Sequence, residues 1–185
     1  MSYRPITDFW LLTRCKYKGG VKRFGGYLGG FPERARALLG VTVDDPVLHV
    51  CGGLARLYPY RGGFGPNDKT VDLDRMTKPD FVVDVSSHPI PLTPGGDLWP
   101  AILADPPYSP EDAMHYEPGS ALYPKPNDLL RKCLTAVRPG GRVGMIHYIL
   151  PSPPKNTRFV AAVGVMCGFN NRIRIYSVFE KSHEI

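Results

Sequence analysis

A carboxylate, two prolines and an aromatic ring stand together in this sequence, as Asp105-Pro106-Pro107-Tyr108 after the apolar run 101–104. The Asp105 carboxylate can accept a hydrogen bond from a reacting group. Proline fixes its backbone φ angle, so the Pro106 carbonyl would keep one direction. The Tyr108 ring offers a face on which a planar group can stack. Alternatively, the two prolines simply end a strand, and the other two residues accompany them by chance.

Short apolar runs that end in glycine or an acidic residue predict the strands that position this motif. They lie at residues 47–51, 69–74, 81–85, 101–104 and 141–150. Nearly continuous apolar strands are typical of a buried parallel sheet. In open α/β sheets, ligands bind at the carboxyl ends of the strands, which is where Asp105 is expected.

Other segments complete the predicted fold. Two β-rich runs, 158–165 and 172–179, are separated by a few residues and predict an antiparallel hairpin. Good helix formers predict helices over 32–39 and 128–137, and Gly40 is a suitable C-cap for the first of them.

The Asp105-Pro106-Pro107-Tyr108 sequence resembles the signature of the class I S-adenosylmethionine-dependent amino methyltransferases. These are the DNA adenine-N6 and cytosine-N4 enzymes, with some RNA methyltransferases as relatives. The resemblance covers about residues 47–180. It implies an α/β, Rossmann-like class I methyltransferase fold with a mostly parallel seven-stranded sheet and an antiparallel C-terminal hairpin.

The resemblance also implies a mechanism. An exocyclic amine of a base is a poor nucleophile, because its lone pair is conjugated into the ring. The Asp105 carboxylate and the Pro106 carbonyl would accept hydrogen bonds from this amine, with Pro107 helping to fix the backbone. An extruded base would stack on Tyr108. The sulfonium methyl donor is already activated, so no metal is expected.

A site for the cofactor S-adenosylmethionine is implied at the ends of the first strands. Family members carry an acidic residue, an aromatic residue and a Gly-x-Gly sequence after the first strand. Here His49 takes the acidic position, Cys51 takes the aromatic one, and Gly53 and Ala55 stand for the two glycines. A packed strand-end histidine is the alternative interpretation of His49.

Two acidic residues after the next strands complete the implied cofactor site. Asp72 would accept hydrogen bonds from the ribose hydroxyls, with Asp74 as the second choice. Asp84 would lie near the adenine of the cofactor. The alternative for each of them is a solvated acid.

The positive charge is concentrated in the first 40 residues. The chain of 185 residues has a net charge of +6, and residues 1–40, with eight basic and two acidic side chains, account for all of it. Within this segment, residues 16–31 mix cations, aromatic residues and glycines, which favours contact with a polyanion such as nucleic acid. A solvated basic surface or a flexible arm is the alternative.

The length predicts a single domain, residues 1–185, in which the basic segment 1–40 precedes an α/β catalytic body at 41–185. No apolar stretch is long enough for a membrane span, and the N-terminus lacks the apolar region of a secretory signal. The four cysteines form no Cys-x-x-Cys pair, which argues against a zinc site and a disulfide framework. A cytoplasmic location is therefore expected.

These observations together predict an amino methyltransferase that acts on nucleic acid, DNA being favoured over RNA, at adenine N6. No target-recognition region is evident, so we expect low sequence specificity, or specificity from a homodimer or a partner chain. Such economy of length would suit a phage or mobile-element enzyme. The alternatives are a methyltransferase of RNA or of a free nucleotide, and a non-catalytic subunit that kept the fold.

Overall fold

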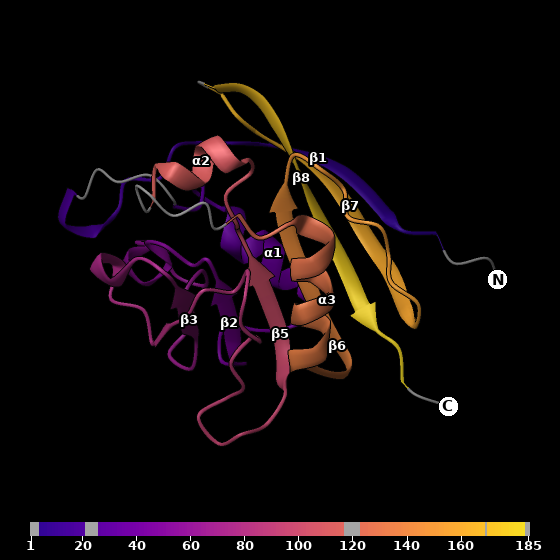
Figure 1. The fold of residues 1–185 in the computed structure, drawn as a ribbon. Helices are drawn as coiled ribbons and strands as arrows, with labels where there is room; N and C mark the ends of the chain where they lie inside the picture. The colour runs from indigo at the N-terminus through magenta and orange to yellow at the C-terminus, as the bar shows by residue number, and fades with distance from the viewer. Residues whose placement is uncertain (1–3, 21–25, 117–122, 169, 184–185) are drawn as a thin grey trace.

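A mixed sheet of eight strands organises the chain in a computed structural model, which describes residues 4–20, 26–116, 123–168 and 170–183. Across the sheet the order is β1-β7-β8-β6-β5-β2-β3-β4 (Figure 1). The strands are β1 (Ile6–Leu12), β2 (Val47–Val50), β3 (Lys69–Asp72), β4 (Phe81–Val82), β5 (Trp99–Ala104), β6 (Val137–His147), β7 (Thr157–Cys167) and β8 (Asn170–Lys181).

The centre of the sheet is parallel, and its C-terminal hairpin is antiparallel. β2 pairs in parallel with β3 and β5, as do β3 with β4 and β5 with β6. β8 runs antiparallel to both β6 and β7. The predicted Rossmann-like α/β sheet is therefore confirmed. Every residue of β2 is buried, as expected for a strand covered on both faces.

The sheet has one strand more than the seven expected, because β1 from the basic segment pairs in parallel with β7. Trp10 and Leu12 of β1 are buried, whereas Phe9 and Leu11 are exposed. This alternation is typical of an edge strand with one covered face. Residues 1–40 therefore contribute a strand to the core of the α/β body as well as positive charge.

Strand boundaries also differ from the prediction, most of all in β4 and β6. β4 contains only two residues of the run 81–85, because the chain turns at Asp84, whose carbonyl accepts the N–H groups of Ser87 and His88. β6 begins at Val137, earlier than expected, because it follows directly from the preceding helix.

Helices cover the two faces of the sheet. α1 (Phe31–Leu39) lies against one face, and α3 (Pro126–Ala136) lies over β5 and β6 on the other (Figure 1). Gly40 ends α1 with a left-handed conformation, φ 71°, which confirms the predicted C-cap. The short helices are η1 (Lys18–Gly20), η2 (Ala55–Leu57), η3 (Arg75–Thr77) and α2 (Pro110–Met114).

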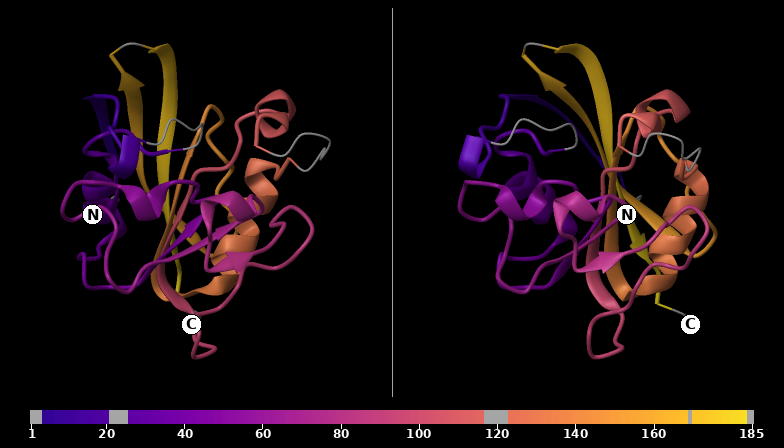
Figure 2. Two further views of the ribbon diagram at one scale, coloured as in Figure 1. Left: turned by 90° about the vertical axis from the view of Figure 1, so that its left-hand side faces the viewer. Right: turned by 60° about the vertical axis from the view of Figure 1, so that its left-hand side comes forward.

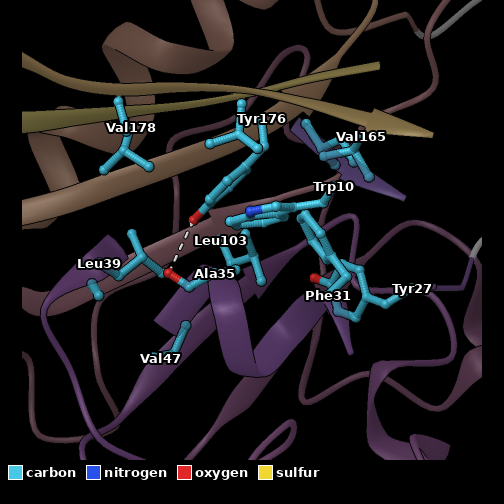
Figure 3. Close-up of a cluster of buried hydrophobic side chains, with 14 of the residues drawn as sticks. Trp10, Tyr27, Phe31, Ala35, Leu39, Val47, Leu103, Val165, Tyr176 and Val178 are labelled. Carbon is cyan, nitrogen blue, oxygen red and sulfur yellow. Dashed lines mark hydrogen bonds between the residues drawn. The ribbon is translucent and has the colours of Figure 1, made fainter. Parts of the chain in front are cut away.

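Aromatic side chains join β1, α1 and β8 in the core under α1. The Phe31 ring packs edge-on against Tyr176, with centroids 5.2 Å apart, and Trp10 lies 6.0 Å from Tyr176. The Tyr176 hydroxyl donates a hydrogen bond of 3.3 Å to the Ala35 carbonyl (Figure 3). A side chain at Gly144 would overlap the Tyr176 ring, so glycine is needed at this position of β6.

In the part of the chain that the structure describes, no helix has both the length and the apolar character needed to cross a membrane. All four cysteines are free thiols.

Candidate active site

The carboxyl ends of β2, β3, β4 and β5 meet around one pocket, which we call the first pocket. Four of the predicted cofactor residues, Cys51, Gly53, Asp72 and Asp84, come together here with Asp105. The full lining is Cys51, Gly53, Asp72, Leu73, Asp74, Val83, Asp84, Val85, Asp105, Pro107, Ala113, Tyr116 and Pro124. Residues from four separate strand ends thus share one site, as parallel topology requires.

Asp72 fixes the loop that follows β2. One of its carboxylate oxygens accepts the Gly53 N–H at 2.8 Å, and the other accepts the Asp74 N–H at 3.0 Å. Cys51 and Gly53 both have positive φ angles, 53° and 46°, so the loop turns sharply beside the pocket. Burial raises the pKa of Asp72, against the opposing effect of these hydrogen bonds.

Asp84 is held in a tight turn at the end of β4. Its carboxylate accepts hydrogen bonds from the Ser86 N–H at 2.9 Å and the Ser86 hydroxyl at 2.6 Å, and from the Ser87 hydroxyl. Burial acts to raise the pKa of Asp84, but these hydrogen bonds outweigh it, and the pKa is lowered. Asp84 is therefore a carboxylate at neutral pH.

Asp105 stands at the end of β5, where its N–H bonds to the Val50 carbonyl at 3.0 Å. The Tyr108 hydroxyl donates a hydrogen bond of 2.8 Å to one oxygen of its carboxylate. Burial raises the pKa of Asp105 to about 6, although the Tyr108 hydroxyl and the Arg174 charge act to lower it. The group is therefore mostly ionised near pH 7 and can accept a further hydrogen bond.

A second pocket lies on the other side of Asp105 and encloses about 350 Å³, a volume within the usual range for ligand sites. Its aromatic walls include Tyr27, Phe31, Tyr116 and Tyr148. The full lining is Gly26, Tyr27, Leu28, Phe31, Asp105, Tyr108, Asp112, His115, Tyr116, Ile146, Tyr148, Arg172 and Arg174. Asp105 and Tyr116 belong to both pockets, so ligands in the two pockets would meet at these residues.

His49 lines neither pocket. Its ring is buried, with Nε2 3.0 Å from an Asp68 carboxylate oxygen and Nδ1 3.0 Å from the Tyr27 hydroxyl. Asp68 also pairs with the buried guanidinium of Arg36 and accepts the Val47 N–H at 3.0 Å. Both ring nitrogens are thus engaged in a buried network, which matches the packed-histidine interpretation.

The remaining predicted residues are divided between the pockets and the core. Pro107 lines the first pocket and Tyr108 the second, whereas Ala55 and Pro106 are buried and line neither.

The basic segment is only partly available to a partner, because Arg36 lies in the buried network. Its residues 21–25 lie outside the described part of the chain.

Sequence reasoning missed Arg174, which reaches the second pocket from β8. Arg174 lies on the same face of β8 as Tyr176, and its half-buried side chain forms part of the wall of the second pocket. Its guanidinium lies 5.3 Å from the centre of the Tyr108 ring. No signal in the sequence marks this position, because arginines that alternate with Ile173 and Ile175 are typical of the solvent-facing side of a strand. Among the described residues, no group of three or more His, Cys, Asp or Glu side chains could hold a metal ion.

Comparison with known proteins identifies the fold. No protein-family model matches the sequence, and no curated protein matches it either. Among solved structures, yhhF from Escherichia coli, provisionally described as a methyltransferase, aligns with a TM-score of 0.56 at 10% identity over 89% of this chain and 92% of its own. The chain has a Rossmann-like methyltransferase fold.

A second structure with this methyltransferase fold is TrmN from Thermus thermophilus, with a TM-score of 0.53 and 19% identity. The alignment covers 85% of this chain but only 50% of TrmN, so the chain spans half the length of that relative. In the methyltransferase fold of this chain, the two pockets lie at the carboxyl ends of the parallel strands, where open α/β sheets bind their ligands.

Proposed function

We propose that this protein transfers a methyl group from S-adenosylmethionine to the exocyclic amine of a nucleobase, adenine N6 in DNA. The observation that carries the proposal is the position of Asp105, which forms part of the wall of two adjoining pockets. A cofactor in the first pocket and a base in the second would meet at this carboxylate. The methyltransferase fold and the resemblance of residues 105–108 to the DNA enzymes support it.

The first pocket has groups that suit the nucleoside part of the cofactor. Each carboxylate oxygen of Asp72 accepts one N–H, so each keeps a lone pair for a ribose hydroxyl. Val83 and Val85 supply an apolar wall for the adenine, next to Asp84. The enclosed part of the pocket is small, about 60 Å³, so its walls must part or the cofactor must lie in its open mouth. When bound, the cofactor supplies a methyl group activated by the sulfonium.

The second pocket supplies the groups that act on the acceptor. Asp105 is mostly ionised at neutral pH, since its pKa is about 6. Tyr108 donates to one of its oxygens, so the other can accept a hydrogen bond from an amine. That bond draws the amine toward tetrahedral geometry and frees its lone pair. Tyr116 and Tyr148 would enclose the base with aromatic surface.

The test is to incubate the protein with labelled S-adenosylmethionine and duplex DNA, single-stranded DNA or RNA, and to identify methylated nucleosides by mass. We expect N6-methyladenine from DNA, and no product with Asp105→Ala at unchanged cofactor affinity. A product only from RNA would refute DNA as the substrate. Absence of cofactor binding in calorimetry would instead refute enzymatic methyl transfer.

Recognition of a target sequence is proposed to be weak. Base readout requires several side chains at groove edges, and the described residues form one sheet with its covering helices and connections. Mapping of methylated positions in a random DNA pool should show a short or degenerate site. A long unique site methylated by the isolated chain would contradict this part of the proposal.

A further inference from the structure

The second pocket has a cationic wall that methyl transfer to a base does not by itself require. Arg172 and Arg174 are alternate residues of β8, so both face the pocket. Arg172 is exposed and donates to the Tyr148 hydroxyl at 3.4 Å, and Arg174 is half-buried above Tyr108. Two guanidinium groups therefore stand at the side of an aromatic pocket whose floor contains Asp105.

Arg174 has hydrogen-bonding capacity that the fold does not use. Its Nε atom is buried, and among the described residues it has no hydrogen-bond partner. In the same part of the chain, no carboxylate lies within ion-pairing distance of Arg174, although Asp105 and Asp112 line the same pocket. A buried unpaired donor on a charged side chain is costly. An anionic ligand would offset this cost by interacting with the part of the guanidinium that lines the pocket.

Phosphate is the anion that best matches this wall. A planar guanidinium can donate two parallel hydrogen bonds to phosphate oxygens, which makes arginine the usual residue for such recognition. The other walls of the pocket are aromatic, so a base fits inside while its phosphate stays near the arginines. The carboxylate at the floor excludes a phosphate from the position of the reacting amine by charge repulsion.

We propose that Arg172 and Arg174 bind the phosphate of the nucleotide whose base enters the second pocket, so that the protein recognises a nucleotide within a strand and not a free base or nucleoside. This inference rests on the proposed function for the identity of the ligand in the pocket. It assigns a contact with nucleic acid to the β7–β8 hairpin, whereas the charge pattern of the sequence predicted such a contact in residues 1–40.

Further cations lie where they would extend the phosphate contact along a nucleic-acid strand. Arg14, Lys16 and Lys18 are exposed in the segment next to the pocket. The Tyr17 hydroxyl fixes this segment by donating to the carbonyl of Tyr27, a wall residue, at 2.9 Å. Figure 2 shows this segment, α2 and the joined end of the β7–β8 hairpin gathered at one end of the sheet. Phosphates on either side of the bound nucleotide would face these cations.

The inference is tested by binding, without methyl transfer as the readout. A short fluorescein-labelled single-stranded oligodeoxyadenylate and its RNA counterpart are titrated with wild-type protein, Arg172→Gln, and the double variant R172Q/R174Q, at several salt concentrations. Deoxyadenosine and deoxyadenosine monophosphate serve as competitors. Arg138→Gln, which removes an exposed arginine from the start of β6, is the matched control. Circular dichroism verifies that each variant is folded.

We expect the double variant to bind the oligonucleotide roughly tenfold more weakly or worse at low salt. The slope of log affinity against log salt should become shallower by about 0.7, the value for one lost phosphate contact on a single strand. Arg172→Gln should show part of both effects, and Arg138→Gln neither. Deoxyadenosine monophosphate should displace the oligonucleotide from the wild-type protein better than deoxyadenosine does. With the double variant, the two competitors should be equally effective.

The inference is overturned if the folded Arg172→Gln and R172Q/R174Q variants bind with the affinity and salt slope of wild type. It is also overturned if the affinity falls while the salt slope stays unchanged, because the arginines then only hold Tyr108 and Asp105 in place. Either result leaves the mass analysis of methylated nucleosides free to succeed. Conversely, arginine-dependent binding without any methylated product refutes the proposed function and keeps the phosphate site.

Discussion

Replacement of Asp105 by asparagine should make the protein more stable at neutral pH. Burial raises the pKa of Asp105 to about 6, whereas an aspartate in an unfolded chain titrates near 3.9. A difference of about two pH units corresponds to about 3 kcal/mol of folding free energy lost when the group is ionised. Asparagine carries no charge, and its amide oxygen can still accept the hydrogen bond from Tyr108.

The gain should depend on pH in a defined direction. Above about pH 6 the carboxyl group is ionised in both the folded and the unfolded state, and the full destabilisation is present. Between about pH 6 and pH 4 only the folded protein takes up the proton, so the destabilisation shrinks as the pH falls. Below about pH 4 both states are protonated, and the gain from Asp105→Asn should vanish.

Urea unfolding, followed by tryptophan fluorescence at several pH values, measures this effect. Asp105→Asn should raise the free energy of unfolding by about 2–3 kcal/mol near pH 7, and a gain of about 2 kcal/mol should raise the melting temperature by roughly 4–8 °C. The control is Asp97→Asn, in an exposed turn, which should change little. No gain at neutral pH, or a gain that persists below about pH 4, would refute a burial-raised pKa for Asp105.

The same substitution should slow methyl transfer. Loss of a charge-assisted hydrogen bond to the amine costs about 1.5–3 kcal/mol, which corresponds to a rate roughly 10- to 150-fold lower. The wild-type rate should fall about tenfold per pH unit below about pH 6, because Asp105 becomes protonated, while the residual rate of the variant stays flat. Labelled methyl transfer at saturating cofactor measures the rate lost in the variant and the pH dependence of both proteins. A wild-type rate that is constant across this range would contradict the role of Asp105.

Two further substitutions test the surroundings of the site. Asp72→Ala should weaken S-adenosylmethionine binding roughly tenfold or more in calorimetry, because the proposed ribose acceptor and the anchor of Gly53 are lost together. Asp68→Asn should lower the free energy of unfolding by about 3–5 kcal/mol in urea titrations, because it leaves the buried Arg36 without its counter-charge. Burial acts to raise the pKa of Asp68, but its His49 and Arg36 partners lower it. Wild-type stability should therefore fall as the pH drops below about 4, and less so in Asp68→Asn.

Local features of the sequence were sufficient to predict the parallel core and the place of its key carboxylate. Two successive prolines cannot donate to a sheet ladder, so β5 ends before Pro106 and Asp105 lies at its end. The left-handed turn at Gly40 requires only the conformational freedom of glycine. The antiparallel hairpin depends on strands that are close in sequence. Each of these properties is decided by neighbouring residues, and so it can be deduced from their order.

Only the tertiary structure determined which way the side chains of the site point and how their pKa values are shifted. β2 is buried on both faces, so the pattern of its residues could not indicate that His49 points toward Asp68 and away from the first pocket. The sequence did not reveal β1, which lies within the basic segment. Its partner β7 lies at the opposite end of the chain, so no local pattern indicates that the two strands pair. The pKa of Asp105 and the place of Arg174 arise where distant segments meet. Burial and charge at such a point depend on contacts in three dimensions, which no local pattern contains.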